Sequence, residues 1–68
     1  MSNSAVKKEE TKIRKIRRDI GIPITEVARR VGVSHTAVQK WDYGKAFPRK
    51  EHLIKLAKVL RCSVADFY

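Results

Sequence analysis

The sequence predicts an all-α fold, a compact bundle of five short helices. Apolar residues recur three and four positions apart in several segments, which is the spacing of one helix face. Glycine, serine and proline separate these segments, and no segment alternates apolar and polar residues for long enough to form a strand. A chain of 68 residues makes one domain at most. We expect residues 1–10 to be a flexible N-terminal arm and residues 11–68 to be the folded domain.

The first predicted helix runs from Thr11 to Ile20. Ile13, Ile16 and Ile20 recur on one face, and basic residues occupy the others. Gly21 ends this helix, because glycine readily adopts the left-handed conformation of a helix C-terminus.

The second and third predicted helices are joined by a very short turn. The second begins near Pro23 or Ile24, and Gly32 stops it. Ser34 supplies an N-cap oxygen for the third, which runs from His35 to about Tyr43. Inward positions of the second helix are Val27, Ala28 and Val31.

A fourth helix is predicted from Lys50 to Arg61, after a loop that contains Pro48. Its apolar stripe is Leu53, Leu56, Ala57 and Leu60. Ser63 caps a last short helix, which brings Val64 and Phe67 to the core.

The charge of the chain favours a polyanionic partner. Lysine and arginine number 16 against 7 acidic residues, a net charge of +9, and nucleic acid is the leading candidate. No apolar run approaches the roughly 20 residues that span a bilayer, and no hydrophobic signal segment follows the basic start, so we expect a cytoplasmic protein. The single cysteine, Cys62, is expected to be a small hydrophobe. One cysteine and two distant histidines predict no metal, no cofactor and no enzymatic activity.

Residues 25–45 fit the separate tasks of a helix-turn-helix. Ala28 lets two helices cross closely, Gly32 allows the positive φ of a sharp turn, and Val33 fills the space beneath it. Val38 and Trp41 anchor the third helix to the core, so Trp41 is expected to pack rather than to stack on bases. The residues left on the outward and flanking faces are His35, Thr36, Gln39 and Lys40.

This pattern resembles the phage repressor and Cro family of helix-turn-helix proteins, the lambda repressor-like domains, over roughly Thr11 to Phe67. A match of this length is far more specific than a lone short motif. The residues that carry it are Ala28, the Val31-Gly32-Val33-Ser34 turn, Val38, Trp41, Gly44, Pro48, Leu53, Leu56, Ala57, Leu60 and Ser63.

The resemblance implies a five-helix bundle that binds operator DNA as a homodimer, with the third helix in the major groove. The implied base readers are His35, Thr36 and Lys40, with Gln39 beside them. Lysine donates to guanine, glutamine pairs with adenine, and threonine bonds either partner or touches a thymine methyl. The implied phosphate contacts are Ser34, Tyr43, Lys45 and Arg49.

The resemblance also implies a partly buried ion pair between Arg17 and Asp42. One departure concerns the second helix, where the family usually has a serine or threonine cap followed by a phosphate-binding glutamine. Pro23 and Ile24 stand there instead, so that side-chain contact is lost, while the backbone amides remain available to a phosphate.

These expectations define a sequence-specific transcriptional regulator, a repressor or Cro-like protein of phage or prophage type, in the bacterial cytoplasm or nucleoid. It would bind a near-palindromic operator with half-sites about 34 Å apart. The candidate dimer surface comprises Val59, Phe67 and Tyr68. One alternative is an antitoxin-like protein-interaction module with autoregulatory DNA binding, in which Ile54 or Val59 meets the partner. Another is nonspecific coating of nucleic acid.

Overall fold

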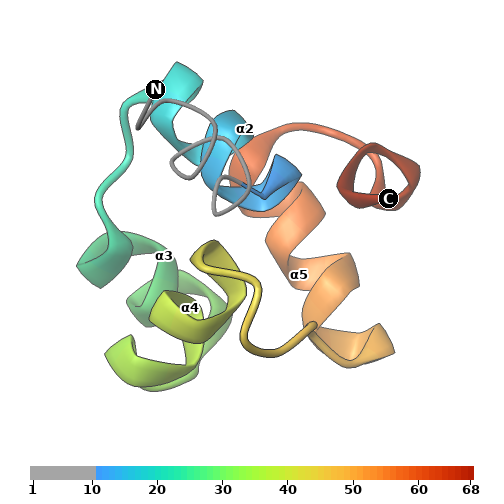
Figure 1. Cartoon of the computed structure of the whole chain (residues 1–68). Coiled ribbons are helices and arrows are strands. Elements are labelled where there is room, and N and C mark those ends of the chain that lie inside the picture. The colour runs from blue at the N-terminus through green and yellow to red at the C-terminus, as the bar shows by residue number, and fades with distance from the viewer. Residues whose placement is uncertain (1–10) are drawn as a thin grey trace, which may run out of the picture.

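Helices make up the regular structure of residues 11–68, the part of the chain that the computed structural model describes (Figure 1). The elements are α2 (Lys12–Ile20), α3 (Ile24–Val31), α4 (His35–Asp42), α5 (Lys50–Leu60) and the 3-10 helix η1 (Val64–Phe67). The all-helical prediction is confirmed. The last predicted helix is a 3-10 turn instead of an α-helix, because its four residues close i→i+3 hydrogen bonds such as Asp66 N to Ser63 O. The predicted arm, residues 1–10, lies outside the described residues.

Local capping chemistry sets the helix boundaries. Thr11 caps α2, its Oγ accepting from the Arg14 N–H at 3.1 Å, and Ser34 caps α4 in the same way. Pro23 precedes α3 without a side-chain cap, as predicted. Arg61, predicted as the last residue of its helix, is instead the cap residue of α5 at a φ of 55°.

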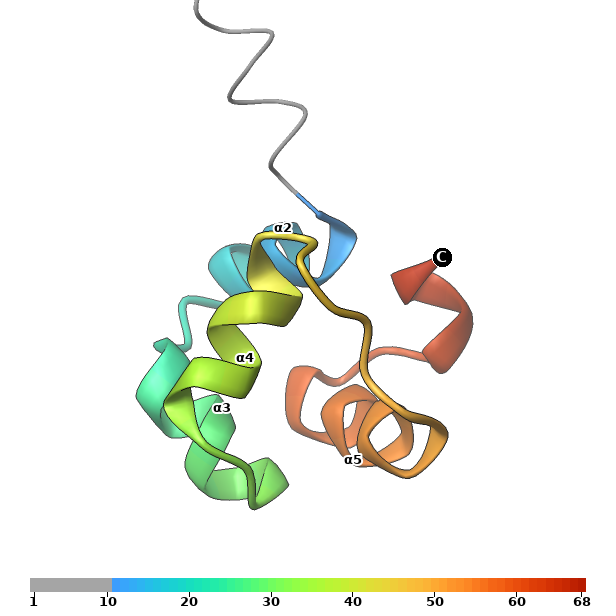
Figure 2. The same cartoon turned by 60° about the horizontal axis from the view of Figure 1, so that its bottom comes forward.

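Helix α3 packs against both α4 and α5 (Figure 1). Figure 2 shows α2 beside the C-terminal end of α4, with η1 following α5 on the other side. The turn η1 contacts both α2 and α5 and so closes the bundle. The buried core consists of Ile13, Val27, Ala28, Val31, Val38, Trp41, Leu53, Leu56, Ala57, Leu60 and Phe67.

Ile20 does not face the core as predicted. Ile13 is buried and Ile16 packs against the core, but Ile20 is 47% exposed. Ile20 is the final residue of α2, and Gly21 then turns the chain in a left-handed conformation. Ile22, two residues further on, packs against the core instead.

The hydroxyl of Thr11 ties α2 to the end of α4. Its Oγ donates to the Asp42 carbonyl at 2.9 Å, one of the carbonyls that the end of a helix leaves without an intrahelical partner. Gly44 lies directly beside this tie, and a Cβ there would stand 3.2 Å from Cγ2 of Thr11. The hydrogen bonds of Thr11 to the Asp42 carbonyl and the Arg14 N–H hold its side chain in place, so Cγ2 cannot easily move away from such a Cβ.

We therefore predict that Gly44→Ala is more destabilising than the same change at Gly21. Both glycines have positive φ, 74° and 83°, which costs a residue with a Cβ about 1–2 kcal/mol. Only Gly44 adds the close contact, since a Cβ at Gly21 has no neighbour within 4 Å. Urea denaturation followed by the fluorescence of Trp41, the single tryptophan, measures both. A Gly44→Ala loss no greater than that of Gly21→Ala would contradict a rigid α2–α4 junction.

Candidate nucleic-acid interface

The turn between α3 and α4 has the geometry of a helix-turn-helix. Gly32 adopts a φ of 87°, and both its N–H and that of Val33 donate to the Ala28 carbonyl, at 2.8 and 3.0 Å. Ala28 is buried where α3 packs against α4, and Val33 packs against the core. Each residue performs the task that the sequence analysis gave it.

The inner face of α4 is fixed to the body of the protein. Val38 is fully buried and Trp41 is 5% exposed, so the predicted anchors are confirmed as core residues. Trp41 also lies beside His52 of α5, with 5.7 Å between the ring centroids. The predicted base readers lie on the opposite and flanking faces and are all exposed: His35, Thr36, Gln39 and Lys40.

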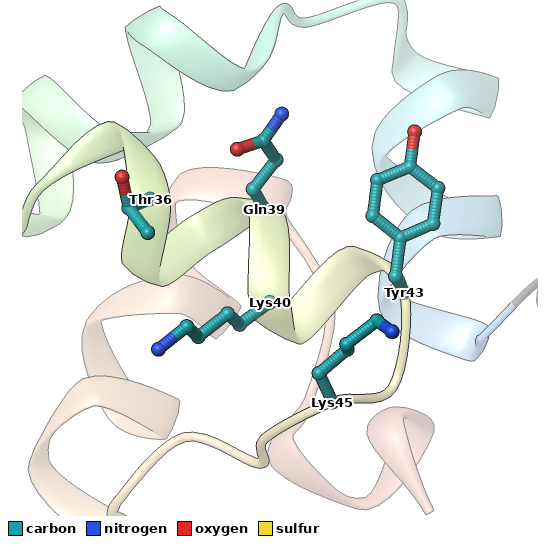
Figure 3. A pocket seen from close by; sticks show the side chains of 5 residues that line it. All are labelled: Thr36, Gln39, Lys40, Tyr43 and Lys45. Atoms are coloured by element: carbon teal, nitrogen blue, oxygen red, sulfur yellow. The ribbon is translucent and has the colours of Figure 1, made fainter.

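The exposed face of α4 is hollowed. A shallow concavity of about 310 Å³ has as its lining five of the eight predicted DNA-contact residues: Thr36, Gln39, Lys40, Tyr43 and Lys45 (Figure 3). Four of them lie three or four positions apart on α4 and its C-cap, and Lys45 follows in the loop to α5. The concavity therefore presents two cations, an amide and two hydroxyl groups to the same partner.

The other three predicted contacts lie outside this concavity. His35 is exposed in the first turn of α4. Ser34 uses its Oγ to accept from the Ala37 N–H at 3.1 Å, which leaves its own O–H to donate elsewhere. Arg49 is exposed at the N-cap of α5.

The predicted ion pair between Arg17 and Asp42 is confirmed. Asp42 is 1% exposed, and its carboxylate accepts from Nε of Arg17 at 3.0 and 3.2 Å and also from Nη2. Nη1 of the same arginine donates to the Ile22 carbonyl at 3.0 Å, in the connection between α2 and α3. One guanidinium thus joins α2, this connection and the last residue of α4.

Arg14 is a residue of this region that the sequence analysis missed. Its guanidinium carbon lies 4.8 Å from the ring centroid of Tyr43, within the range of a cation–π contact. The basic residues of its helix gave no sign of this role, because a charged helix face is usually just solvated. Only the crossing of α2 and α4 brings the two side chains together.

Outside the concavity, one carboxyl group and one thiol have shifted pKa values. Hydrogen bonds from Arg29 and then Arg30 hold the pKa of the Glu26 carboxyl below its ordinary value, and the Arg30 bond is 2.7 Å long. Burial, followed by the nearby charge of Asp66, raises the pKa of the Cys62 thiol. Cys62 packs partly buried against the core as predicted, and the raised pKa keeps the thiol protonated at neutral pH.

Neither a metal cluster nor a membrane-spanning element is found within residues 11–68. No three histidine, cysteine or acidic side chains of this part gather where they could hold a metal ion. None of the helices in this part combines the length and the apolar character needed to cross a membrane.

Fold and site together define a DNA-binding helix-turn-helix regulator, a class that presents an exposed polar helix face from a rigid body. A helix-turn-helix family model matches residues 13–67, and the chain belongs to this Cro/C1-type family. The family is one of DNA-binding regulatory domains and not of enzymes. No curated protein and no solved structure is significantly similar to the chain.

Proposed function

We propose that the chain is a repressor of phage or prophage type that binds a near-palindromic operator as a homodimer. The observation that carries this proposal is the concavity on the outer face of α4, to which Thr36, Gln39 and Lys40 contribute, while Val38 and Trp41 hold the inner face. Lysine and glutamine at such a face can hydrogen-bond guanine and adenine edges in the major groove. Bound across a promoter in the nucleoid, the protein would block the polymerase.

The length of α4 supports a dimer. Its eight residues extend about 12 Å at 1.5 Å per residue, which spans roughly three to four base pairs. So short a contact specifies little sequence, whereas two copies read two half-sites about 34 Å apart.

Exposed aromatic residues offer a surface for the second copy. Tyr68 is 68% exposed and packs against Phe47, itself 49% exposed, with 5.1 Å between the ring centroids. Of the other candidates named from the sequence, Val59 is partly buried. Phe67 is only 5% exposed, so it belongs to the core and is not available to a partner.

Selection of binding sites from a pool of random duplexes tests the proposal directly. We expect an enriched sequence of two inverted half-sites with centres one helical turn apart. Equal affinity for selected and unselected duplexes would contradict it and favour nonspecific coating of nucleic acid.

We predict that Lys40→Ala costs roughly 1–3 kcal/mol of binding free energy and relaxes the preference at one operator position. Lys40 is exposed and lines the concavity, and its ammonium group can donate to guanine O6 or N7. Competition titrations against duplexes with single base changes measure both effects. Lys58→Ala, which removes an exposed lysine from α5, is the control and should change neither. A loss of equal size on every duplex would make Lys40 a phosphate contact.

A second candidate function is an antitoxin-like interaction module that also regulates its own promoter. Ile54 favours it, because this residue lies outside the core of α5 and is 45% exposed. Co-purification of a stoichiometric protein partner, lost in Ile54→Lys, would support this candidate over a self-sufficient repressor.

A further inference from the structure

Arg14 places a positive charge from α2 at the edge of the concavity on the exposed face of α4. Its guanidinium lies over the ring of Tyr43, and Tyr43 is 42% exposed and lines the concavity. Figure 3 shows the Tyr43 ring extending from the end of α4 toward α2, with its hydroxyl group at the outer end. The two side chains therefore share one border of the proposed DNA-binding face.

The charge of Arg14 is not neutralised within residues 11–68. The neighbouring Arg17 is fully engaged by Asp42 and the Ile22 carbonyl. Arg29 and Arg30 are bound to Glu26. No carboxylate of the described residues pairs with Arg14, whose charge faces only the electron-rich ring of Tyr43.

Only the inner part of the Arg14 guanidinium is buried, so its two Nη groups are the donors left for a partner. Its Nε is buried without a hydrogen-bond partner, the only side-chain nitrogen or oxygen of the described residues in that condition. The two Nη groups are not buried and remain available as donors. Partial burial also weakens the hydration of the guanidinium, which strengthens its attraction to an incoming anion.

We propose that Arg14 and Tyr43 form a phosphate-binding pair that receives a backbone phosphodiester of the DNA strand flanking the groove entered by α4. The two Nη groups match the geometry of two phosphate oxygens, and the Tyr43 hydroxyl adds a third donor. The tyrosine ring orients the arginine. This inference rests on the proposed docking of α4 and adds a contact from a helix outside the helix-turn-helix.

The salt dependence of duplex binding tests Arg14 against a matched neighbour. Arg14→Gln is compared with Lys15→Gln, which removes one charge from the other side of α2, where Lys15 lines a separate hollow with Cys62 and Asp66. Each variant is titrated with a duplex carrying the selected site and with a scrambled duplex. Arg14→Gln should make the slope of log affinity against log salt shallower by about 0.9 per protomer. It should weaken binding to both duplexes by the same factor, while Lys15→Gln leaves the slope unchanged.

A neutral phosphate analogue locates the contact without relying on one variant. Duplexes with a single methylphosphonate linkage at successive positions should include one that weakens wild-type binding but not that of Arg14→Gln. Tyr43→Leu, at a position that is 42% exposed, should be insensitive to that same linkage. If Arg14→Gln does not fold, the wild-type scan and Tyr43→Leu still decide the matter.

The outcomes separate this inference from the proposed function. A wild type that prefers its selected site, with the same slope in Arg14→Gln and Lys15→Gln, overturns the phosphate pair alone. A wild type without preference between duplexes overturns sequence-specific function, and the slope comparison still decides Arg14. Saturable shifts of the Tyr43 ring signals with inorganic phosphate alone, lost in Arg14→Gln, would identify a free-anion site and overturn the contact with DNA.

Discussion

Replacing Arg17 with methionine is expected to lower the free energy of unfolding by about 3–5 kcal/mol, the usual cost of stranding one member of a buried ion pair. Asp42 is 1% exposed and receives three hydrogen bonds from Arg17. The methionine keeps most of the packing volume of the arginine stem but leaves this carboxylate without its cation. A domain of this size has a total stability of roughly 3–10 kcal/mol, so much of the variant should be unfolded at 25 °C.

Urea denaturation measured by circular dichroism gives the loss, and a double variant provides the control. Arg17→Met with Asp42→Leu removes both charges and should recover most of the stability, because apolar replacement of a buried pair is often neutral. A single variant within about 1 kcal/mol of the wild type would mean that the pair contributes no more than an exposed one.

The helices could be predicted because their signals are local. The stripe of Leu53, Leu56 and Leu60 and the stops at Gly21 and Gly32 each depend on residues within one or two turns. The anchored inner face of α4 followed from the same periodicity. The residues of α4 that do not belong to this inner stripe could then be assigned to its outer face.

Contacts between distant segments could not be derived in this way. Thr11 meets Asp42 and Arg14 meets Tyr43 only because α2 crosses the end of α4, and no spacing along the chain encodes that angle. The Arg17–Asp42 pair was expected only through the family resemblance. Phe67 was expected both in the core and at the dimer surface, and only the first expectation holds.

Raising the salt concentration is expected to weaken DNA binding steeply. Lys45 and Arg49 provide two proposed cationic phosphate contacts per protomer, which predicts a slope of about −3.6 for a homodimer, and Arg14 brings it to about −5.4. A fourfold increase in salt would then reduce the affinity roughly 150-fold in the first case and roughly 2,000-fold in the second. Fluorescence anisotropy with the selected duplex, measured across a salt series, gives the slope.

The count behind this slope depends on which cations are already paired. Arg17 adds nothing, because Asp42 neutralises it. Arg29 and Arg30 share the single negative charge of Glu26, which leaves one net positive charge between them. Lys45→Gln should make the slope shallower by about 0.9 per protomer, whereas Lys55→Gln, on an exposed part of α5, should not. A wild-type slope of log affinity against log salt close to zero would contradict the proposed phosphate contacts. Equal effects of the two lysine variants would mean that the net charge of +9, and not the α4 side of the molecule, attracts the DNA.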